Sequence, residues 1–485
     1  MDKKVIVYEK KEVKYPTLQN KTFRPGTRYP EYCFDEIDIQ KNEVYEMVRE
    51  SLFLAGYDRP HYGDVEWNPL GELIKPGQTV VIKPNLVMHE NPVQGDTECL
   101  YTHPSVTAAV LDYVVKALSG SGKIIVGDAP MQDCDFDKLI YQSGYFELIK
   151  YYKDKQIDIQ LIDFREIRSK VVHGVYYNIP NENAAGIIVD LKQNSEFSKY
   201  DANYLKRLRI TNYDPHELLR HHQEGKHEYS ISHIILAADI VINLPKPKTH
   251  KKAGVTISLK NMVGTTARKE YLPHHCMGGR ESNGDEYLKK SRLKEIQAKM
   301  MDKINYESAI KHYRRARILK TVNRGISFFI RFGSDQYREG SWSGNETISK
   351  TITDLNKILF YADKEGRMQK EKQRKFLIVA DMIVSGEGEG PVRPSRKETG
   401  IIAVAEQPVC FDEVIATLMG ADILQIPTLQ TARKASGEFP IVEDDDRALL
   451  VSNNKLWNGK RIEDIEYRLN FRPSSGWKDA FIYRD

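Results

Sequence analysis

The densest group of chemically useful side chains lies in residues 243–252, which read Asn-Leu-Pro-Lys-Pro-Lys-Thr-His-Lys-Lys. The two prolines stiffen this segment and carry no amide donor, so they hold Lys246 and Lys248 on an extended backbone. Several ammonium groups placed just after a strand suit a phosphate or carboxylate ligand. A solvated basic loop is the alternative interpretation of the same residues.

Lysine is paired with asparagine at two other places. Lys83 and Asn85 flank a proline at the end of a predicted strand, and Lys260 and Asn261 lie in Ser-Leu-Lys-Asn-Met-Val-Gly at residues 258–264. Asparagine both donates and accepts hydrogen bonds, so it can orient a ligand that lysine only attracts. For the second segment, an ordinary turn is the alternative. The predicted ligand-binding residues are Lys83, Asn85, Asn243, Lys246, Lys248 and Asn261.

Proton transfer is assigned to a smaller set of residues. His103 and His250 each border a predicted strand-end loop, and a histidine titrates near neutral pH. A helix cap or a hydrogen-bonded structural residue is the alternative for each of them. Together with Lys260 and Asp128 they form the predicted catalytic set.

A glycine-rich acidic segment, Gly-Glu-Gly-Glu-Gly-Pro at residues 386–391, follows a strand that we expect to end near Val384. Glycine permits close backbone approach and positive φ, so Gly386, Gly388 and Gly390 are predicted ligand contacts. The pattern is neither a Walker A loop nor a dinucleotide fingerprint. Carboxylate oxygens are ligands for a divalent cation, the one cofactor we expect, and a flexible acidic turn is the alternative. The predicted metal ligands are Asp381, Glu387 and Glu389.

The elements that position these residues follow from hydrophobic periodicity. Residues 79–83 and 123–128 read as strands, and 105–118 between them reads as a helix, which makes a βαβ unit and a parallel sheet. Residues 157–162 alternate apolar and polar side chains, as a half-buried strand does. Short apolar runs typical of strands buried on both faces follow at 187–189, 240–244, 376–381 and 401–404. Residues 412–419 read as a helix closed by Gly420. In open α/β sheets, ligands bind outside the carboxyl ends of the strands, where most of the candidate residues fall.

The predicted fold is therefore an α/β core with a mostly parallel sheet flanked by helices and a basic helical insertion. We place an N-terminal extension packed on the core at 1–78, the core at 79–284 and 341–435, the insertion at 285–340 and a C-terminal extension at 436–485. The insertion is rich in lysine and arginine and contains an apolar patch at 326–330. Either it is a solvated helical insertion whose apolar face packs on the core, or it docks on anionic lipid.

Composition excludes several classes of protein. The chain has 485 residues and a formal net charge of +4, which is too small to indicate a nucleic-acid partner. Its five cysteines are scattered and form no C-x-x-C pair, so no iron–sulfur cluster is expected. We find no apolar run near the ~20 residues of a transmembrane segment, and no signal-peptide core at the N-terminus. A cytoplasmic location is expected.

Together these segments resemble the domain-of-unknown-function 362 family, in an order that is similar to the family's. The resemblance is carried by residues 80–85, 102–104, 126–130, 243–250, 258–264, Asp381 and 386–391. Many members carry a ferredoxin module, whose cysteines this chain lacks. The longer form, with Trp342 and Asp354-Leu355-Asn356, is similar to proteins associated with surface-polysaccharide gene neighbourhoods.

Two functions are consistent with these residues. The first is an enzyme that binds a phosphorylated or otherwise anionic small molecule at the strand ends, where lysines neutralise the anion and asparagines orient it. The second is a non-catalytic protein that binds an anion or a lipid surface, with peripheral membrane contact through the basic insertion.

Overall fold

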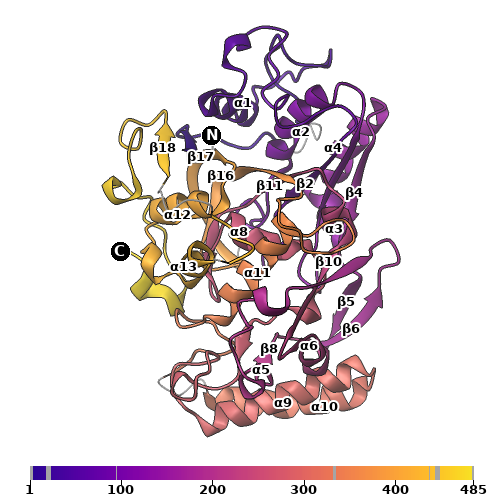
Figure 1. Ribbon diagram of the computed structural model, residues 1–485, viewed down its shortest axis with the longest axis vertical. Helices are drawn as coiled ribbons and strands as arrows, with labels where there is room; N and C mark the ends of the chain where they lie inside the picture. Colours follow the sequence, from indigo (N-terminus) through magenta and orange to yellow (C-terminus); the bar gives the residue numbers. More distant parts are fainter. Residues whose placement is uncertain are drawn as a thin grey trace.

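A ten-stranded sheet organises the fold, as the computed structural model shows for residues 4–17, 23–93, 95–330, 335–435, 437–442 and 448–482. Its main path runs β18-β1-β17-β16-β11-β2-β3-β4 (Figure 1). Strands β4, β3, β2, β11 and β16 are parallel, whereas β17 is antiparallel to β16 and β1 is antiparallel to β17. The strands are β1 (Lys4–Glu9), β2 (Thr79–Pro84), β3 (Lys123–Asp128), β4 (Ile159–Asp163), β11 (Ile240–Leu244), β12 (Lys248–His250), β13 (Gly254–Thr256), β16 (Lys375–Glu389), β17 (Arg393–Ala405) and β18 (Leu449–Ser452).

Helices cover both faces of this sheet, which explains the continuous apolar runs of its strands. Val80 and Ile82 of β2 face one core, and Val81 between them faces the other. The first core is closed by α1 (Glu43–Ala55), α2 (Pro104–Leu118), α3 (Phe136–Ser143) and α4 (Tyr145–Asp154). The second is closed by α8 (Ser258–Asn261), α11 (Thr347–Tyr361), α12 (Pro408–Met419) and α13 (Pro427–Lys434). The predicted α/β class and mostly parallel sheet are confirmed.

The βαβ unit predicted from the sequence is present, with β2 and β3 paired in parallel on either side of α2. The predicted helix at 412–419 is also present as α12, and Gly420 ends it with φ 96°. One strand boundary was wrong, because the strand expected to end near Val384 continues to Glu389. The strand predicted at 187–189 is present, but it belongs to a different sheet, and Ile188 is 50% exposed, so it is not buried on both faces.

A second layer lies below the central sheet and is built mainly from residues between 163 and 284 (Figure 1). It contains a four-stranded sheet of β7 (Gly186–Asp190), β9 (His222–Gln223), β10 (Lys226–Ser232) and β14 (Thr266–Arg268). It also contains the pairs β5 (Ile167–Val172) with β6 (Val175–Pro180) and β8 (Leu208–Arg209) with β15 (His275–Cys276). Its helices are α5 (Ala202–Leu205), α6 (Pro215–His221) and α7 (His233–Leu236).

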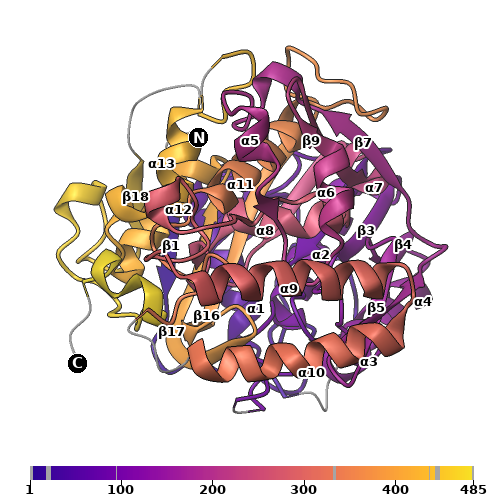
Figure 2. The ribbon, with the colours of Figure 1, turned by 90° about the horizontal axis from the view of Figure 1, so that it is seen from below.

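The basic insertion forms a helical hairpin of α9 (Arg292–Ala309) and α10 (Tyr313–Ile330) at the lower end of the molecule in Figure 1. Seen from below, the two helices lie side by side (Figure 2). Ser308 of α9 donates to the Tyr176 carbonyl of β6 at 2.7 Å, which ties the hairpin to the second layer. Ala316 and Ile330 of α10 are buried, but Phe328 and Phe329 are 55% and 67% exposed. The expected packing of the apolar face on the core therefore holds only in part. Residues 331–334 of the insertion lie outside the described residues.

Both ends of the chain contribute to the central sheet. Strand β1 pairs with β17 on one side and with β18 on the other. The segments placed outside the core by the sequence thus extend its sheet by two strands. None of the described helices combines the length and the apolar character that crossing a bilayer requires.

Candidate functional site

The carboxyl ends of three parallel strands bring polar side chains to one point. Lys83 of β2 is opposite Asn243 of β11 in the sheet register, and both are fully buried. The Lys83 ammonium lies 2.8 Å from Asp128 Oδ1 at the end of β3. The other oxygen of Asp128 accepts from the Leu86 amide at 2.6 Å. The expectation that strand ends gather these residues is met.

Asn261 of α8 joins the strand ends into one hydrogen-bonded network. Its Oδ1 accepts from Lys83 Nζ at 2.9 Å and from Asn85 Nδ2 at 3.0 Å. Its Nδ2 donates to Asn243 Oδ1 at 2.7 Å. Asn85 Oδ1 in turn accepts from Lys248 Nζ at 2.8 Å. Six of the residues predicted from the sequence, with Asp128 included, are therefore linked side chain to side chain.

The short helix α8 is fixed in place by contacts with two packed helices, α11 and α12. The Asp412 carboxylate of α12 accepts from the Ser258 amide at 2.8 Å and from the Leu259 amide at 3.0 Å, at the first turn of α8. Asn356 of α11 donates to the Leu259 carbonyl at 3.1 Å. Lys260 and Asn261 follow directly, so their positions are set by two packed helices.

Gly264 explains how the turn after α8 can approach the ion pair so closely. A Cβ atom at this position would lie 1.9 Å from Asp128 Oδ1 and 2.6 Å from Lys83 Nζ. The Gly264 carbonyl accepts from the Ala129 amide at 2.8 Å, just after β3. A glycine is needed here because any side chain would occupy the space of the Lys83–Asp128 pair.

This network forms one wall of a cavity of about 300 Å³. Among the described residues, two carboxylates, Asp128 and Glu339, line the cavity, and His250 and His274 line it as well. The cavity is lined by six lysines, Lys83, Lys248, Lys251, Lys252, Lys260 and Lys269. Lys252 and Lys269 donate to the Thr211 hydroxyl at 2.8 Å and the Ala129 carbonyl at 2.7 Å. Within the described part of the chain, no hydrogen bond or ion pair involves the Lys260 amine.

Burial shifts the protonation of these lysines. It lowers the pKa of Lys248 and of Lys269 to about 7, and the pKa of Lys252 and of Lys260 to about 8. Charges on neighbouring lysines lower these pKa values further. Burial also lowers the pKa of Lys83, although Asp128 opposes that shift. Near neutral pH the cavity therefore holds several amines close to their titration midpoints.

The two cavity histidines are held in opposite tautomers by the backbone. His250 Nδ1 accepts from the Lys252 amide at 3.0 Å and the Ala253 amide at 3.1 Å, so its proton is on Nε2. His274 Nδ1 lies 2.8 Å from the Leu272 carbonyl, which only accepts, so its Nε2 is unprotonated. Burial holds the pKa of both imidazoles well below the usual value, and the Lys260 charge adds to the lowering. The cavity thus contains one imidazole donor and one imidazole acceptor.

Three further residues predicted from the sequence, Lys246, Asp381 and His103, belong to a second buried network that does not line this cavity. Lys246 Nζ lies 2.8 Å from Asp381 Oδ2 and 2.6 Å from the Tyr15 hydroxyl, which donates to Asp381 Oδ1 at 2.5 Å. Asp381 also accepts from the backbone amides of His103 at 2.8 Å and Ile383 at 3.3 Å. Protein donors therefore occupy both oxygens of Asp381, which indicates a structural role.

His103 belongs to the same network as the N-cap of α2. Its Nδ1 accepts from the Ser105 amide at 3.2 Å, and its ring stacks on Tyr15 with centroids 4.1 Å apart. Burial, followed by the charge of Lys246, holds the pKa of His103 well below its usual value. His103 is thus placed as the helix cap that the sequence offered as the alternative.

The glycine-rich segment is part of a strand and not a loop. Gly386 of β16 pairs with Lys248 of β12, and a Cβ at Gly390 would lie 2.0 Å from the Thr249 carbonyl oxygen. The glycines let β12 pack against the β16–β17 hairpin, whose tip residues Pro391 and Val392 close one side of the cavity. The predicted ligand contacts Gly386, Gly388 and Gly390 are not among the residues that line it.

The acidic residues of the same segment are occupied by the C-terminal part of the chain. Glu387 accepts from the Arg472 amide at 3.0 Å, and Glu389 accepts from the Ser475 amide at 2.7 Å. Asp381 lies six positions before Glu387 on β16, which is about 20 Å of extended chain. No group of three or more metal-ligating side chains is found among the described residues, so the divalent cation stays a prediction.

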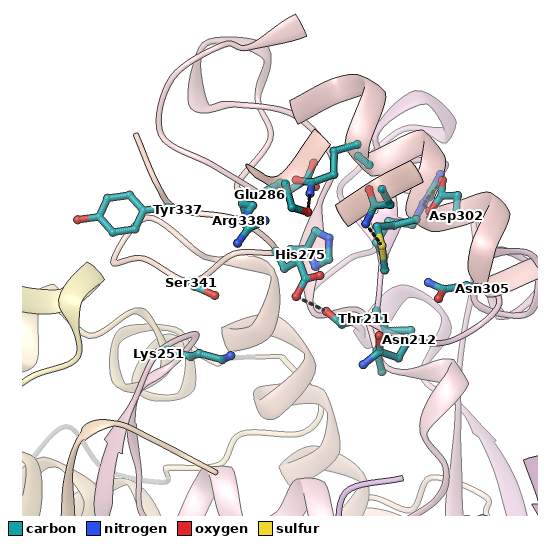
Figure 3. A pocket seen from close by; sticks show the side chains of 18 of the residues that line it. Thr211, Asn212, Lys251, His275, Glu286, Asp302, Asn305, Tyr337, Arg338 and Ser341 are labelled. Carbon is teal, nitrogen blue, oxygen red and sulfur yellow. Dashed lines mark hydrogen bonds and ion pairs between the residues drawn. The ribbon is translucent and has the colours of Figure 1, made fainter. Parts of the chain in front are cut away.

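A larger chamber of about 950 Å³ lies next to the cavity, and residues of both hairpin helices contribute to its lining (Figure 3). Thr211, Asn212, Lys251 and Glu339 line both spaces. In Figure 3, Lys251 comes from below, and Asp302 and Asn305 come from the hairpin side. The chamber is lined by polar side chains that include Arg209, Asn212, Glu286, Gln297, Asp302, Asn305, Asn323 and Arg324. The arrangement is an inner cationic cavity with an outer polar chamber.

Four of the lysines and histidines that line the cavity were not selected from the sequence as site residues. Lys251 and Lys252 are the last two residues of the predicted basic cluster, which was the only signal for them. His274 lines the cavity, whereas its neighbour His275 lines the outer chamber. Lys269 carries no pattern that distinguishes it from a surface lysine.

Comparisons with known proteins agree with the family resemblance. The family model described as Domain of unknown function (DUF362) matches residues 80–190 and 188–417. A thylakoid-associated protein of Synechocystis sp. is 22% identical over 392 residues, which cover 80% of this chain and 78% of that protein. A crystal structure of a protein from Thermotoga maritima covers 72% of this chain with 10% identity and a TM-score of 0.28, and this chain spans about half, 54%, of that one.

Proposed function

This chain belongs to the DUF362 family, and we propose that it is an enzyme that binds an anionic small molecule, such as a phosphate ester or a carboxylate, in the inner cavity. One observation carries the proposal: six lysines line about 300 Å³ of space together with only two carboxylates. One of those carboxylates, Asp128, is already paired with Lys83. Buried cations are normally paired, so an excess of this kind favours an anionic ligand.

Binding of the anion would also increase the protonated fraction of the cavity lysines. With pKa values of about 7 to 8, Lys248, Lys252, Lys260 and Lys269 are each partly neutral near pH 8. A nearby anion favours the ammonium form, so binding should take up protons. The affinity should therefore rise as the pH falls from 9 to 7, provided that the anion keeps its charge.

The outer chamber indicates what the rest of the ligand is like. Its amide, guanidinium and carboxylate side chains suit a body rich in hydroxyl groups. A sugar phosphate, with its phosphate in the cavity and its sugar toward the chamber, fits both spaces. This class is compatible with the surface-polysaccharide association that the sequence suggested.

Isothermal titration calorimetry with inorganic pyrophosphate tests the anion site. We expect binding at pH 7, and a loss of about tenfold or more in Lys260→Gln and in Lys269→Gln, since a charged hydrogen bond contributes about 1.5–3 kcal/mol. Lys290→Gln is the matched control, because Lys290 is exposed on the insertion. Absence of binding by the unaltered protein, or equal affinity in all three variants, would refute the proposal.

A second candidate function is attachment to an anionic membrane through α10. Ile318, Val322 and Phe329 are 67%, 52% and 67% exposed, and their spacing of four and seven residues places them on one helix face. The exposed Arg314 and Arg315 lie one turn before Ile318, on either side of that face. A stripe of this composition suits the headgroup region of an anionic bilayer, and the name of the Synechocystis relative supports such a location.

Vesicle sedimentation tests this candidate. We expect the protein to sediment with phosphatidylglycerol-containing vesicles and not with phosphatidylcholine alone. The double variant Ile318→Ser and Phe329→Ser should remain in the supernatant with its pyrophosphate affinity unchanged. Equal sedimentation of the variant and the unaltered protein would contradict the assignment of α10.

A further inference from the structure

We propose that Lys260 is an amine nucleophile that forms an imine with a carbonyl group of the anionic ligand, with His274 as its proton acceptor. This inference rests on the proposed function, because it places the reactive carbonyl next to the anion-binding lysines. It narrows the substrate class to anionic aldehydes or ketones.

Lys260 differs from most of the cavity lysines in what its amine contacts. Lys83 and Lys248 are tied to Asn261 and Asn85, and Lys252 and Lys269 donate to Thr211 and Ala129. In the described residues, the amines of Lys260 and Lys251 make no such contact, and Lys251 also lines the outer chamber, whereas Lys260 does not. Its backbone is nevertheless fixed, since α8 is held by Asp412 and Asn356. Nucleophilic attack requires an amine that is held in position and is not engaged in another hydrogen bond or ion pair.

The surroundings of Lys260 also favour the neutral, nucleophilic form. Burial and the charges of Lys83 and Lys252 lower its pKa to about 8, while Asp128 opposes the shift. A lysine beside other cations in a desolvated site is a known arrangement for imine formation. Lys252 has a similar pKa, but its amine is engaged by Thr211.

The two histidines complete the arrangement. His274 Nε2 is unprotonated and can accept a proton from the attacking nitrogen, whereas His250 Nε2–H can donate a hydrogen bond to the carbonyl oxygen. Both rings line the cavity, and the Lys260 charge acts on both of them. Because backbone groups fix the tautomers, the donor and the acceptor are already in place before a ligand binds.

The proposed step balances as follows. The Lys260 lone pair adds to the carbonyl carbon, and the C=O π electrons move to oxygen, where His250 stabilises the charge. His274 takes one proton from nitrogen and returns it to oxygen, which gives a carbinolamine. The nitrogen lone pair then expels the hydroxyl group, which leaves as water with one proton from solvent. A protonated iminium remains, and no oxidant or reductant is needed.

Pyridoxal 5′-phosphate followed by borohydride is the direct test, because the probe combines an aldehyde with a phosphate. We expect peptide mass spectrometry to find the reduced adduct on Lys260, with pyrophosphate protecting against it. Pyridoxal, which lacks the phosphate, should label at least about tenfold more slowly. Lys260→Arg keeps the positive charge and should lose the adduct, whereas Lys252→Arg should keep it.

His274→Gln gives a second readout. General base catalysis is typically worth about 100-fold or more, so imine formation should slow by about that factor. A rate equal to that of the unaltered protein would remove His274 from the step. Melting curves of each variant establish that it is folded.

The outcomes separate this inference from the proposed function. Pyrophosphate binding without an adduct on Lys260, or an adduct that persists elsewhere in the cavity after Lys260→Arg, would overturn the nucleophile and leave the anion site standing. If neither pyrophosphate nor pyridoxal 5′-phosphate binds, both proposals fail. Labelling of Lys260 with equal efficiency by pyridoxal would refute the link between imine formation and the anion.

Discussion

Replacing Lys248 with methionine should change how the stability of the protein depends on pH. Lys248 is fully buried and donates to Asn85 Oδ1 at 2.8 Å and to the Leu100 carbonyl. Burial lowers its pKa from 10.5 to about 7 in the native protein. Between these values the unfolded chain holds a proton that the native protein has released, so the native state gains stability as the pH rises.

The size of the effect follows from the two pKa values. Integrating the linkage relation for Lys248 between pH 6 and pH 9 gives about 2.7 kcal/mol of added native stability. Methionine cannot titrate, so Lys248→Met lacks this term. The variant also leaves two buried acceptors without a donor, which costs about 1–3 kcal/mol each at every pH. The stability difference between the two proteins should therefore widen by about 2.7 kcal/mol from pH 6 to pH 9.

Urea unfolding at constant ionic strength, at pH 6, 7, 8 and 9, measures this difference. Lys290→Met serves as the control, since Lys290 is exposed and its removal should leave the pH dependence unaltered. Parallel stability curves for the unaltered protein and Lys248→Met would refute the reasoning. That result would mean that Lys248 keeps its proton through the whole range, and that the cavity holds fixed positive charge.

Three further substitutions probe the packing of the two networks. Gly264→Ala should destabilise the protein by about 1–3 kcal/mol, because the new Cβ would lie 1.9 Å from Asp128 Oδ1; an unchanged melting temperature would show that the turn after α8 can move aside. Asp128→Asn leaves the buried Lys83 ammonium without its anionic partner, so it should lower the free energy of unfolding in urea by about 3–5 kcal/mol. A smaller decrease would be evidence that Lys83 is neutral. Tyr15→Phe removes the hydroxyl between Lys246 and Asp381 and should cost about 1–3 kcal/mol while pyrophosphate affinity in calorimetry stays the same; weaker binding would connect the second network to the cavity.

The strand ends could be predicted from the sequence because their geometry is forced. Parallel neighbours in one sheet end at the same edge, so Lys83, Asp128 and Asn243 had to meet once the βαβ pattern was recognised. Asn261 was found through its pairing with Lys260, although the sequence alone did not place α8 against the sheet. Asp412 fixes that position by accepting from Ser258, which is 154 residues away in the sequence. A local sequence pattern cannot predict a contact over that separation.

The predictions that were wrong or missing also have specific physical causes. Glycine normally weakens a strand, so residues 386–390 were predicted to be a loop. In the structure their lack of side chains lets β12 pack against β16, which makes the extended hairpin possible. Tyr15 could not be foreseen, because its partner Asp381 is 366 residues away. Lys246 and Lys248 look equivalent in the sequence, but the contacts of Lys246 with the remote residues Asp381 and Tyr15 place the two lysines in different networks.

The different partners of Lys246 and Lys248 distinguish a candidate ligand site from a structural contact in this protein. Lys246 lies against Asp381 and Tyr15, so its charge is balanced inside the fold and needs nothing from outside. Lys248, two residues later, has only the neutral oxygens of Asn85 and Leu100, which accept its hydrogen bonds without cancelling its charge. An amide oxygen stabilises an ammonium group less than a carboxylate does, so the amine is left near its titration midpoint. Among the described residues, Lys252 and Lys269 likewise donate only to neutral oxygens, and the Lys260 amine makes no such contact. The missing negative charge is therefore concentrated in one cavity, and an anionic ligand is the simplest group that supplies it.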